Sequence, residues 1–100
     1  MSLDTSTDFS SRVADIVHSI DSGDVLTYGE VAMEAGHPGA ARAVAAALSG
    51  GVPWWRVVGT GGRIVAPSRS EQIARLREEG HVIDSTVDPP RIAGWQTIRT

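Results

Sequence analysis

The sequence predicts a single, mainly helical domain with one short β-hairpin. Apolar residues recur at helical spacing over residues 9–20, and capping signals at Thr27 and Ser68 mark two further helices. A β-prone run at 52–58 is followed by a glycine-rich turn. One hundred residues, 41% of them hydrophobic, can build one core but not two independent ones.

The first helix is defined by an apolar stripe. Thr7 or Asp8 is expected to cap its start, and Gly23 follows its end. The stripe consists of residues three or four apart that share one helical face: Phe9, Val13, Ile16, Val17 and Ile20.

Two short helices are expected next, joined by a tight turn. Thr27 and Glu30 have the spacing of a capping box, and Gly36 ends the helix that they begin. Pro38 suits the first turn of the following helix. Such a pair of helices is typical of a helix-turn-helix.

The second of these helices has an unusual outer face. Ala41, Val44, Ala45 and Leu48 are expected to face inward. The opposite face carries one arginine among small residues, namely Arg42 with Gly39, Ala43 and Ala46. A solvated helix usually carries several charges there, whereas a bare face lets its backbone approach a large flat partner closely.

The second half of the sequence predicts a β-hairpin, or wing, and a last helix. Residues 52–58, the turn at 59–62 and a returning strand at 63–65 resemble a hairpin. Ser68 and Glu71 have capping-box spacing before a short helix that ends near Gly80. We therefore expect one domain over residues 1–100, with a core at about 9–83 and an irregular tail at 84–100 in which Trp95 anchors the chain.

Composition excludes several kinds of site. The chain has no cysteine and only three scattered histidines, so disulfides, a cysteine nucleophile and a metal site are not expected. No nucleophilic triad is visible, and no catalytic residue or cofactor is expected. The sequence has no apolar run of about 20 residues and no signal-peptide pattern at its start, which predicts a cytoplasmic protein with no membrane span.

The charge is unevenly distributed along the chain. The formal net charge is −3, yet residues 39–77 carry six arginines and one glutamate, a local balance of +5. This segment could present one positive face to an anionic partner, or it could be an ordinary solvated surface. Two adjacent tryptophans, Trp54 and Trp55, lie within it. On a strand they would point to opposite faces, either as two core residues or as one core residue and one ring platform for a nucleobase.

A series of motifs occurs in one order along the chain. It runs from Thr27-Tyr28-Gly29-Glu30-Val31-Ala32 through Ala40-Ala41-Arg42-Ala43-Val44 and Pro53-Trp54-Trp55-Arg56-Val57 to Glu79-Gly80. This order resembles the DNA-binding domain of O6-alkylguanine-DNA alkyltransferases over about residues 9–83. The resemblance implies a winged helix-turn-helix-like alkyltransferase fold. It also places Trp54 where those enzymes carry their reactive cysteine.

The resemblance implies a binding protein rather than an enzyme. An indole cannot accept an alkyl group as a thiolate does. A tryptophan at this position is similar to the alkyltransferase-like proteins, which bind O6-alkylguanine in double-stranded DNA without repairing it and mark it for nucleotide excision repair. We expect the same here, from a monomer that is nucleoid-associated if bacterial and that works with nucleotide excision repair proteins.

The resemblance also assigns roles to individual residues. Arg42 matches the finger that fills the stack after a nucleotide is extruded, and Tyr28 matches the tyrosine that helps to rotate that nucleotide. The expected DNA-binding residues are Tyr28, Gly39, Arg42, Ala43 and Ala46. The expected alkylbase pocket comprises Tyr28, Trp54, Val57 and Arg69.

The chain departs from the family pattern at Trp55, where related proteins keep a histidine. In the enzymes that histidine and a glutamate matching Glu79 activate the thiolate. Trp55 and Glu79 are therefore interpreted as a structural relic of the catalytic network, with Trp55 in the core and Glu79 bonded to nearby backbone.

Two other functions remain as alternatives. A winged-helix transcription regulator would need polar base-reading side chains around Arg42, which the sequence lacks. A protein-interaction module could use Trp54 or Trp55 as its anchor.

Overall fold

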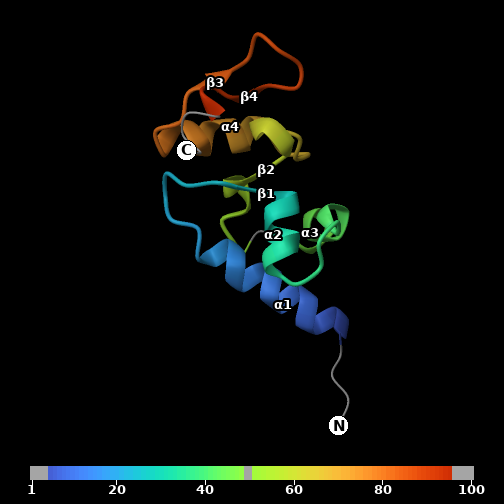
Figure 1. Ribbon diagram of the computed structural model, residues 1–100. Coiled ribbons are helices and arrows are strands. Elements are labelled where there is room, and N and C mark those ends of the chain that lie inside the picture. Colours follow the sequence, from blue (N-terminus) through green and yellow to red (C-terminus); the bar gives the residue numbers. More distant parts are fainter. Residues whose placement is uncertain (1–4, 49–50, 96–100) are drawn as a thin grey trace.

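The computed structural model describes residues 5–48 and 51–95 and confirms a mainly helical fold with a small β-hairpin. Figure 1 shows α1–α3 gathered in one half of the molecule and α4 with the hairpin in the other. The elements in chain order are α1 (Thr5–His18), β1 (Leu26–Thr27), α2 (Tyr28–Glu34), α3 (Ala41–Ala47), β2 (Val57–Val58), α4 (Arg69–Glu78), β3 (Ile83–Asp84) and β4 (Arg91–Ile92).

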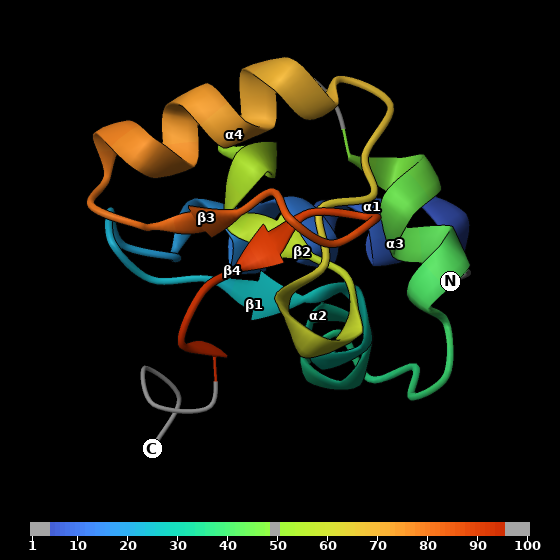
Figure 2. The ribbon, with the colours of Figure 1, turned by 90° about the horizontal axis from the view of Figure 1, so that it is seen from above.

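Two apolar clusters fill these halves, and β2 lies between them. Val57 belongs to the cluster of α1–α3, whereas Val58 belongs to the cluster of α4 and the hairpin. Consecutive residues of a strand point to opposite sides, so one short strand serves both clusters. β2 pairs in parallel with β1 in the register Leu26↔Val57. In Figure 2 α4 runs along one side of the short strands.

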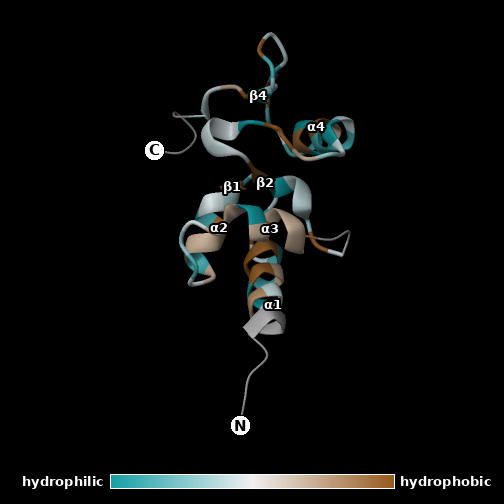
Figure 3. Cartoon of the chain, turned by 90° about the vertical axis from the view of Figure 1, so that its right-hand side faces the viewer, coloured by the Kyte–Doolittle hydropathy of each residue, from teal (hydrophilic) through white to brown (hydrophobic). Residues whose placement is uncertain are grey.

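The apolar stripe of α1 is confirmed. Val13 and Val17 are fully buried, Ile20 is buried just beyond the helix, and Phe9 and Ile16 pack beside them. Figure 3 shows hydrophobic and hydrophilic bands alternating along this helix. The helix begins at Thr5, which is earlier than a cap at Thr7 or Asp8 allows.

The capping box at the start of α2 is also confirmed. Glu30 N donates to Thr27 Oγ1 at 3.0 Å, and Thr27 N donates to Glu30 Oε1 at 2.8 Å. The helix that follows begins at Ala41 and not at Pro38. Gly39 has a φ of +87°, in the left-handed region, so this residue cannot lie inside a right-handed helix.

The predicted hairpin at 52–65 is wrong in position. Trp54–Arg56 forms a 3-10 turn, and Val57–Val58 is already paired with β1. The returning segment instead bonds a later part of the chain, because Ile64 N donates to Pro90 O at 2.8 Å and Arg63 bridges to Arg91. The small antiparallel hairpin is formed by β3 and β4, with Ile83 opposite Ile92.

Two expectations for the last third of the chain also need correction. Ser68 precedes α4 but makes no side-chain capping bond, so a second capping box is absent there. The core extends beyond residue 83, because Ile92 is only 1% exposed and belongs to the second cluster. Trp95 packs against that cluster, as expected of an anchor, and its ring lies so close to Gly62 that a Cβ there would be 2.7 Å from Trp95 Cε3.

In the described residues no helix is long and apolar enough to cross a membrane.

Candidate nucleic-acid interface

A cleft of about 580 Å³ opens between α3 and the start of α4. Most of its lining is apolar and comes from four parts of the chain. The lining residues are Tyr28, Ala41, Arg42, Ala45, Leu48, Trp54, Val65, Ala66, Pro67, Ser68 and Glu71. Three of the residues expected to act on DNA, Tyr28, Arg42 and Trp54, therefore lie around one cleft.

Tyr28 is placed by the capping box, because it is the first residue of α2. Its ring is half-buried against the α1–α3 cluster. Burial raises the pKa of the Tyr28 phenol above its ordinary value. The hydroxyl therefore stays protonated at neutral pH and can donate a hydrogen bond to an anionic group.

The surface of α3 is divided between two sides. Val44 alone is fully buried, and Ala43 and Ala46 are exposed, as expected. Ala45, which was expected to face inward, is exposed as well. Ala43 and Ala46 line a separate shallow depression that also includes Phe9 and His37. Arg42 is exposed but borders the cleft together with Ala41 and Ala45, instead of lying opposite them.

The two adjacent tryptophans diverge into different halves of the molecule. Trp54 packs against the α1–α3 cluster and lines the cleft, whereas Trp55 packs against the second cluster. Their rings meet edge-on, with centroids 6.2 Å apart and planes at 85°. The expected divergence is confirmed, although a 3-10 turn and not a strand produces it.

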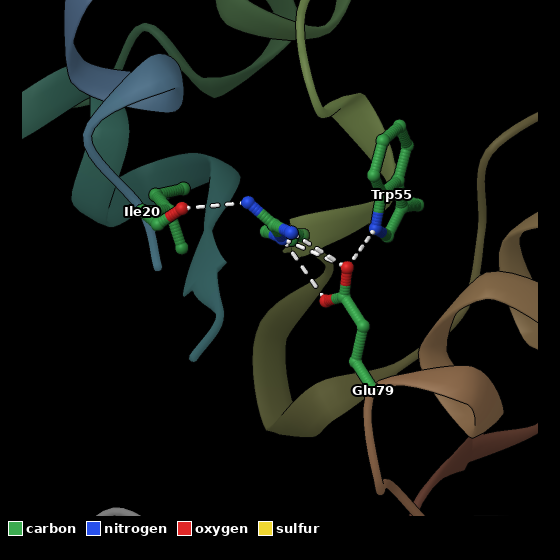
Figure 4. A network of polar contacts seen from close by, with 4 residues as sticks. Ile20, Trp55 and Glu79 are labelled. Atoms are coloured by element: carbon green, nitrogen blue, oxygen red, sulfur yellow. Dashed lines mark hydrogen bonds and ion pairs between the residues drawn. The ribbon is translucent and has the colours of Figure 1, made fainter. Parts of the chain in front are cut away.

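Trp55 and Glu79 form a polar network with Arg56 (Figure 4). Trp55 Nε1 donates to Glu79 Oε2 at 2.9 Å, and Arg56 Nη2 donates to the same oxygen at 2.7 Å. Arg56 Nη1 also donates to the carbonyl oxygen of Ile20 at 2.8 Å. The network thus ties the end of α4 to the segment that follows α1. Glu79 also accepts a hydrogen bond from the Gly23 backbone, as expected, but its chief partners are side chains.

The electrostatics of this network favour the charged pair. The hydrogen bonds from Arg56 hold the pKa of the Glu79 carboxyl below its usual value, although burial opposes that shift. Glu79 in turn raises the pKa of the Arg56 guanidinium. Arg56 is therefore neutralised inside the fold and does not face the cleft, contrary to the idea of a continuous positive face.

Two residues expected in the pocket do not line it. The Val57 side chain is fully buried in the α1–α3 cluster, because β2 turns it inward. Arg69 lies outside the lining, and its Nη1 is 3.7 Å from a carboxylate oxygen of Asp88. The segment at 65–68 and Glu71 line the cleft instead. The spacing of Ser68 and Glu71 predicts a helix cap, so Glu71 was expected to bond the helix start and not to line the cleft.

In the part of the chain that the structure describes, no group of three or more His, Cys, Asp or Glu side chains could hold a metal ion. Among its lining groups the cleft has aromatic rings, the guanidinium of Arg42, the phenol of Tyr28 and the carboxylate of Glu71. Such a set can bind and orient a flat ligand.

Comparison with known proteins gives a consistent result. Residues 8–81 match the family model described as 6-O-methylguanine DNA methyltransferase, DNA binding domain. A DNA base-flipping protein of Vibrio parahaemolyticus is 38% identical over 79 residues, which are 72% of this chain and 79% of that protein. Alkyltransferase-like protein 1 of Schizosaccharomyces pombe is 38% identical over 88 residues, with coverage of 79% and 82%.

A solved structure extends this similarity to the fold. The crystal structure of S. pombe Atl1 in complex with damaged DNA containing O6-carboxymethylguanine matches with a TM-score of 0.75 and 34% identity. The match covers 92% of this chain and 90% of that one.

Proposed function

This chain belongs to the family of the 6-O-methylguanine DNA methyltransferase DNA-binding domain, and on that premise we propose that it binds double-stranded DNA containing O6-alkylguanine without removing the alkyl group. The observation that carries the proposal is the cleft in which Tyr28, Arg42 and Trp54 meet around an apolar lining. Its volume of about 580 Å³ is within the range of small-molecule pockets and suits an extruded base with a substituent.

The proposed docking uses α2 and α3 in the minor groove. Gly39, Ala43 and Ala46 are exposed and small, so they allow a close approach of α3 to the DNA. Arg42 enters the base stack and replaces the extruded nucleotide, while Tyr28 donates to the phosphate that rotates with it. Extrusion costs a few kcal/mol and costs least for a damaged base, which itself favours the lesion.

The absence of transfer follows from the side chains available. The sequence contains no cysteine, and Trp54 forms the wall of the cleft where the family resemblance places the reactive thiol. Glu79 is occupied by Trp55 and Arg56 and is not available to activate a nucleophile. Because the bound lesion persists, a second system must remove it, and we propose nucleotide excision repair for that step.

The exposed surface of α3 argues against the transcription-regulator alternative. A major-groove reader presents several polar side chains to base edges. The exposed residues of α3 are Arg42, Ala43, Ala45 and Ala46, of which only Arg42 is polar.

The test compares two duplexes that differ by one O6-methyl group. Fluorescence anisotropy should show tighter binding to the duplex with O6-methylguanine than to its guanine control. Mass spectrometry of the recovered oligonucleotide should find the methyl group still attached, whereas an active methyltransferase run in parallel removes it. Equal affinity for the two duplexes would refute lesion recognition, and loss of the methyl group would refute the absence of transfer.

A further inference from the structure

The carboxylate of Glu71 is a charged group in an otherwise mostly apolar cleft. Among the described lining residues only Arg42 and Glu71 carry a full charge. They belong to different helices, since Arg42 lies on α3 and Glu71 in the first turn of α4. The start of α4 therefore gives the cleft a negative group.

The cation paired with Glu71, Arg75, lies outside the cleft lining. Arg75 Nε donates to Glu71 Oε2 at 3.1 Å, and the Arg75 guanidinium lies 4.4 Å from the ring centroid of Trp55, which belongs to the second cluster. The Glu71 side chain remains 52% exposed in this pair. Glu71 lines the cleft and Arg75 does not, so the carboxylate is the member of this pair that an occupant of the cleft meets.

Arg42 does not compensate for Glu71 once DNA is bound. In the proposed complex the Arg42 side chain enters the base stack and leaves the cleft. Arg69, the other candidate cation, lies outside the lining, in an exposed pair whose Nη1 is 3.7 Å from Asp88. The remaining charged lining residue is then Glu71.

We propose that Glu71 makes this cleft select against O6-substituents that end in an anion, and in favour of neutral or cationic ones. The inference rests on the proposed function and specifies its substrate class. A carboxylate attached to O6 would be brought close to the Glu71 carboxylate, and like charges within a Debye length of about 8 Å repel each other. A neutral substituent of the same shape has the same contacts without that repulsion.

The experiment uses three duplexes that each carry one modified guanine. O6-carboxymethylguanine is the anionic lesion, O6-carbamoylmethylguanine is its neutral isostere, and O6-(2-aminoethyl)guanine is a cationic analogue. We expect the full-length chain to bind the carboxymethyl duplex roughly three- to tenfold more weakly than the carbamoylmethyl duplex at low salt. The aminoethyl duplex should bind at least as tightly as the neutral one. The ratio between anionic and neutral lesions should shrink as salt is raised.

Two variants isolate the cleft charge. Glu71→Gln should bring the affinity ratio of the anionic and neutral lesions close to one. Glu78→Gln is the matched control, because it removes the same charge from an exposed position of α4 about 10 Å further along the helix. It should leave the ratio unchanged. A ratio near one in the unmodified chain, or a ratio that Glu71→Gln does not alter, would overturn the role of Glu71.

The failure of this inference can be distinguished from failure of the proposed function. If the carbamoylmethyl duplex binds better than the unmodified duplex but charge has no effect, lesion binding stands and only the selectivity is refuted. If the O6-methylguanine and carbamoylmethyl duplexes both bind no better than the unmodified duplex, the proposed function is refuted as well.

Discussion

Trp55 donates its indole N–H to Glu79 at 2.9 Å, which joins the turn beside the cleft to the end of α4. Arg56 completes the arrangement by bonding both Glu79 and the carbonyl of Ile20. The network thus connects the two halves of the domain and holds the tryptophan turn in place. The resemblance implied that these positions are a relic of a thiolate-activating network, and in this chain they form a structural tie.

Replacing Glu79 tests that structural role. Glu79→Gln keeps an acceptor for Trp55 but removes the charge opposite Arg56, whose side chain is only 16% exposed. Removing one partner of a fully buried pair costs about 3–5 kcal/mol, and the partial exposure here lowers the expected loss to about 2–3 kcal/mol of unfolding free energy. Urea denaturation measures it. Glu78→Gln, at an exposed neighbouring position, should change stability by less than about 0.5 kcal/mol. Equal losses of unfolding free energy in Glu79→Gln and Glu78→Gln would contradict a specific stabilising role of the Glu79 network.

The same carboxylate predicts how stability depends on pH. The pKa of Glu79 is lowered in the folded chain, chiefly by the hydrogen bonds from Arg56. The unfolded chain therefore binds a proton at higher pH than the folded chain does. This contribution to stability is complete above the unfolded pKa of about 4.3 and is lost as the pH falls through the lower folded value.

The measurement compares urea midpoints of the unmodified chain and Glu79→Gln from about pH 7 to about pH 3. The stability difference should be constant above about pH 5 and should shrink below about pH 4, since the glutamine cannot titrate. Other carboxyl groups, such as Asp84, titrate in both chains and cancel. If the stability difference between the two chains stays constant at acidic pH, the charge of Glu79 does not contribute to the network with Arg56 and Trp55.

The two sequences with capping-box spacing predict different effects of substitution. Thr27→Ala removes a bond to Glu30 N that the structure contains, and it should lower stability by about 1 kcal/mol. Ser68→Ala removes a hydroxyl that makes no capping bond, so it should be nearly neutral. Urea denaturation of both variants checks this contrast. Similar losses would mean that Ser68 caps α4 in solution.

These motifs show where sequence reasoning succeeds and where it fails. The cap at Thr27 depends on residues within four positions of each other, and the stripe of α1 depends on local periodicity, so both are readable from the sequence. Ser68 has a ψ of 58° instead of the extended value that an N-cap needs. That angle depends on the path of the preceding segment along the cleft wall, which tertiary packing decides and local sequence does not.

The strand pairings were missed for a similar reason. β1 pairs with β2 across about 30 residues, and Ile64 bonds Pro90, so tertiary packing decides both. The resemblance places Tyr28, Arg42 and Trp54 in one site, and the structure brings all three around the cleft. Val57 and Arg69 were expected in the pocket, but neither lines it. The direction in which a side chain points from a two-residue strand or from the first turn of a helix depends on the rest of the fold.

The arginine of α3 provides the most direct test of the proposed interface. Arg42→Ala should leave the fold intact, because the side chain is exposed. It should weaken binding to O6-methylguanine duplex by about 1–3 kcal/mol, since the extruded nucleotide then has no replacement in the stack. Fluorescence anisotropy at fixed salt measures the loss, and urea denaturation confirms the fold.

Arg77→Ala is the matched control for that variant. Arg77 is also exposed but lies on α4 outside the cleft lining. Both substitutions remove one positive charge, but only Arg42 lies on a helix that the proposed complex places against DNA, so Arg77→Ala should change the salt-dependent affinity less and leave lesion discrimination unchanged. Only Arg42→Ala should reduce the ratio between lesion and control duplexes. If both variants lose the same affinity on both duplexes, Arg42 contributes charge alone and the assignment of a finger is wrong.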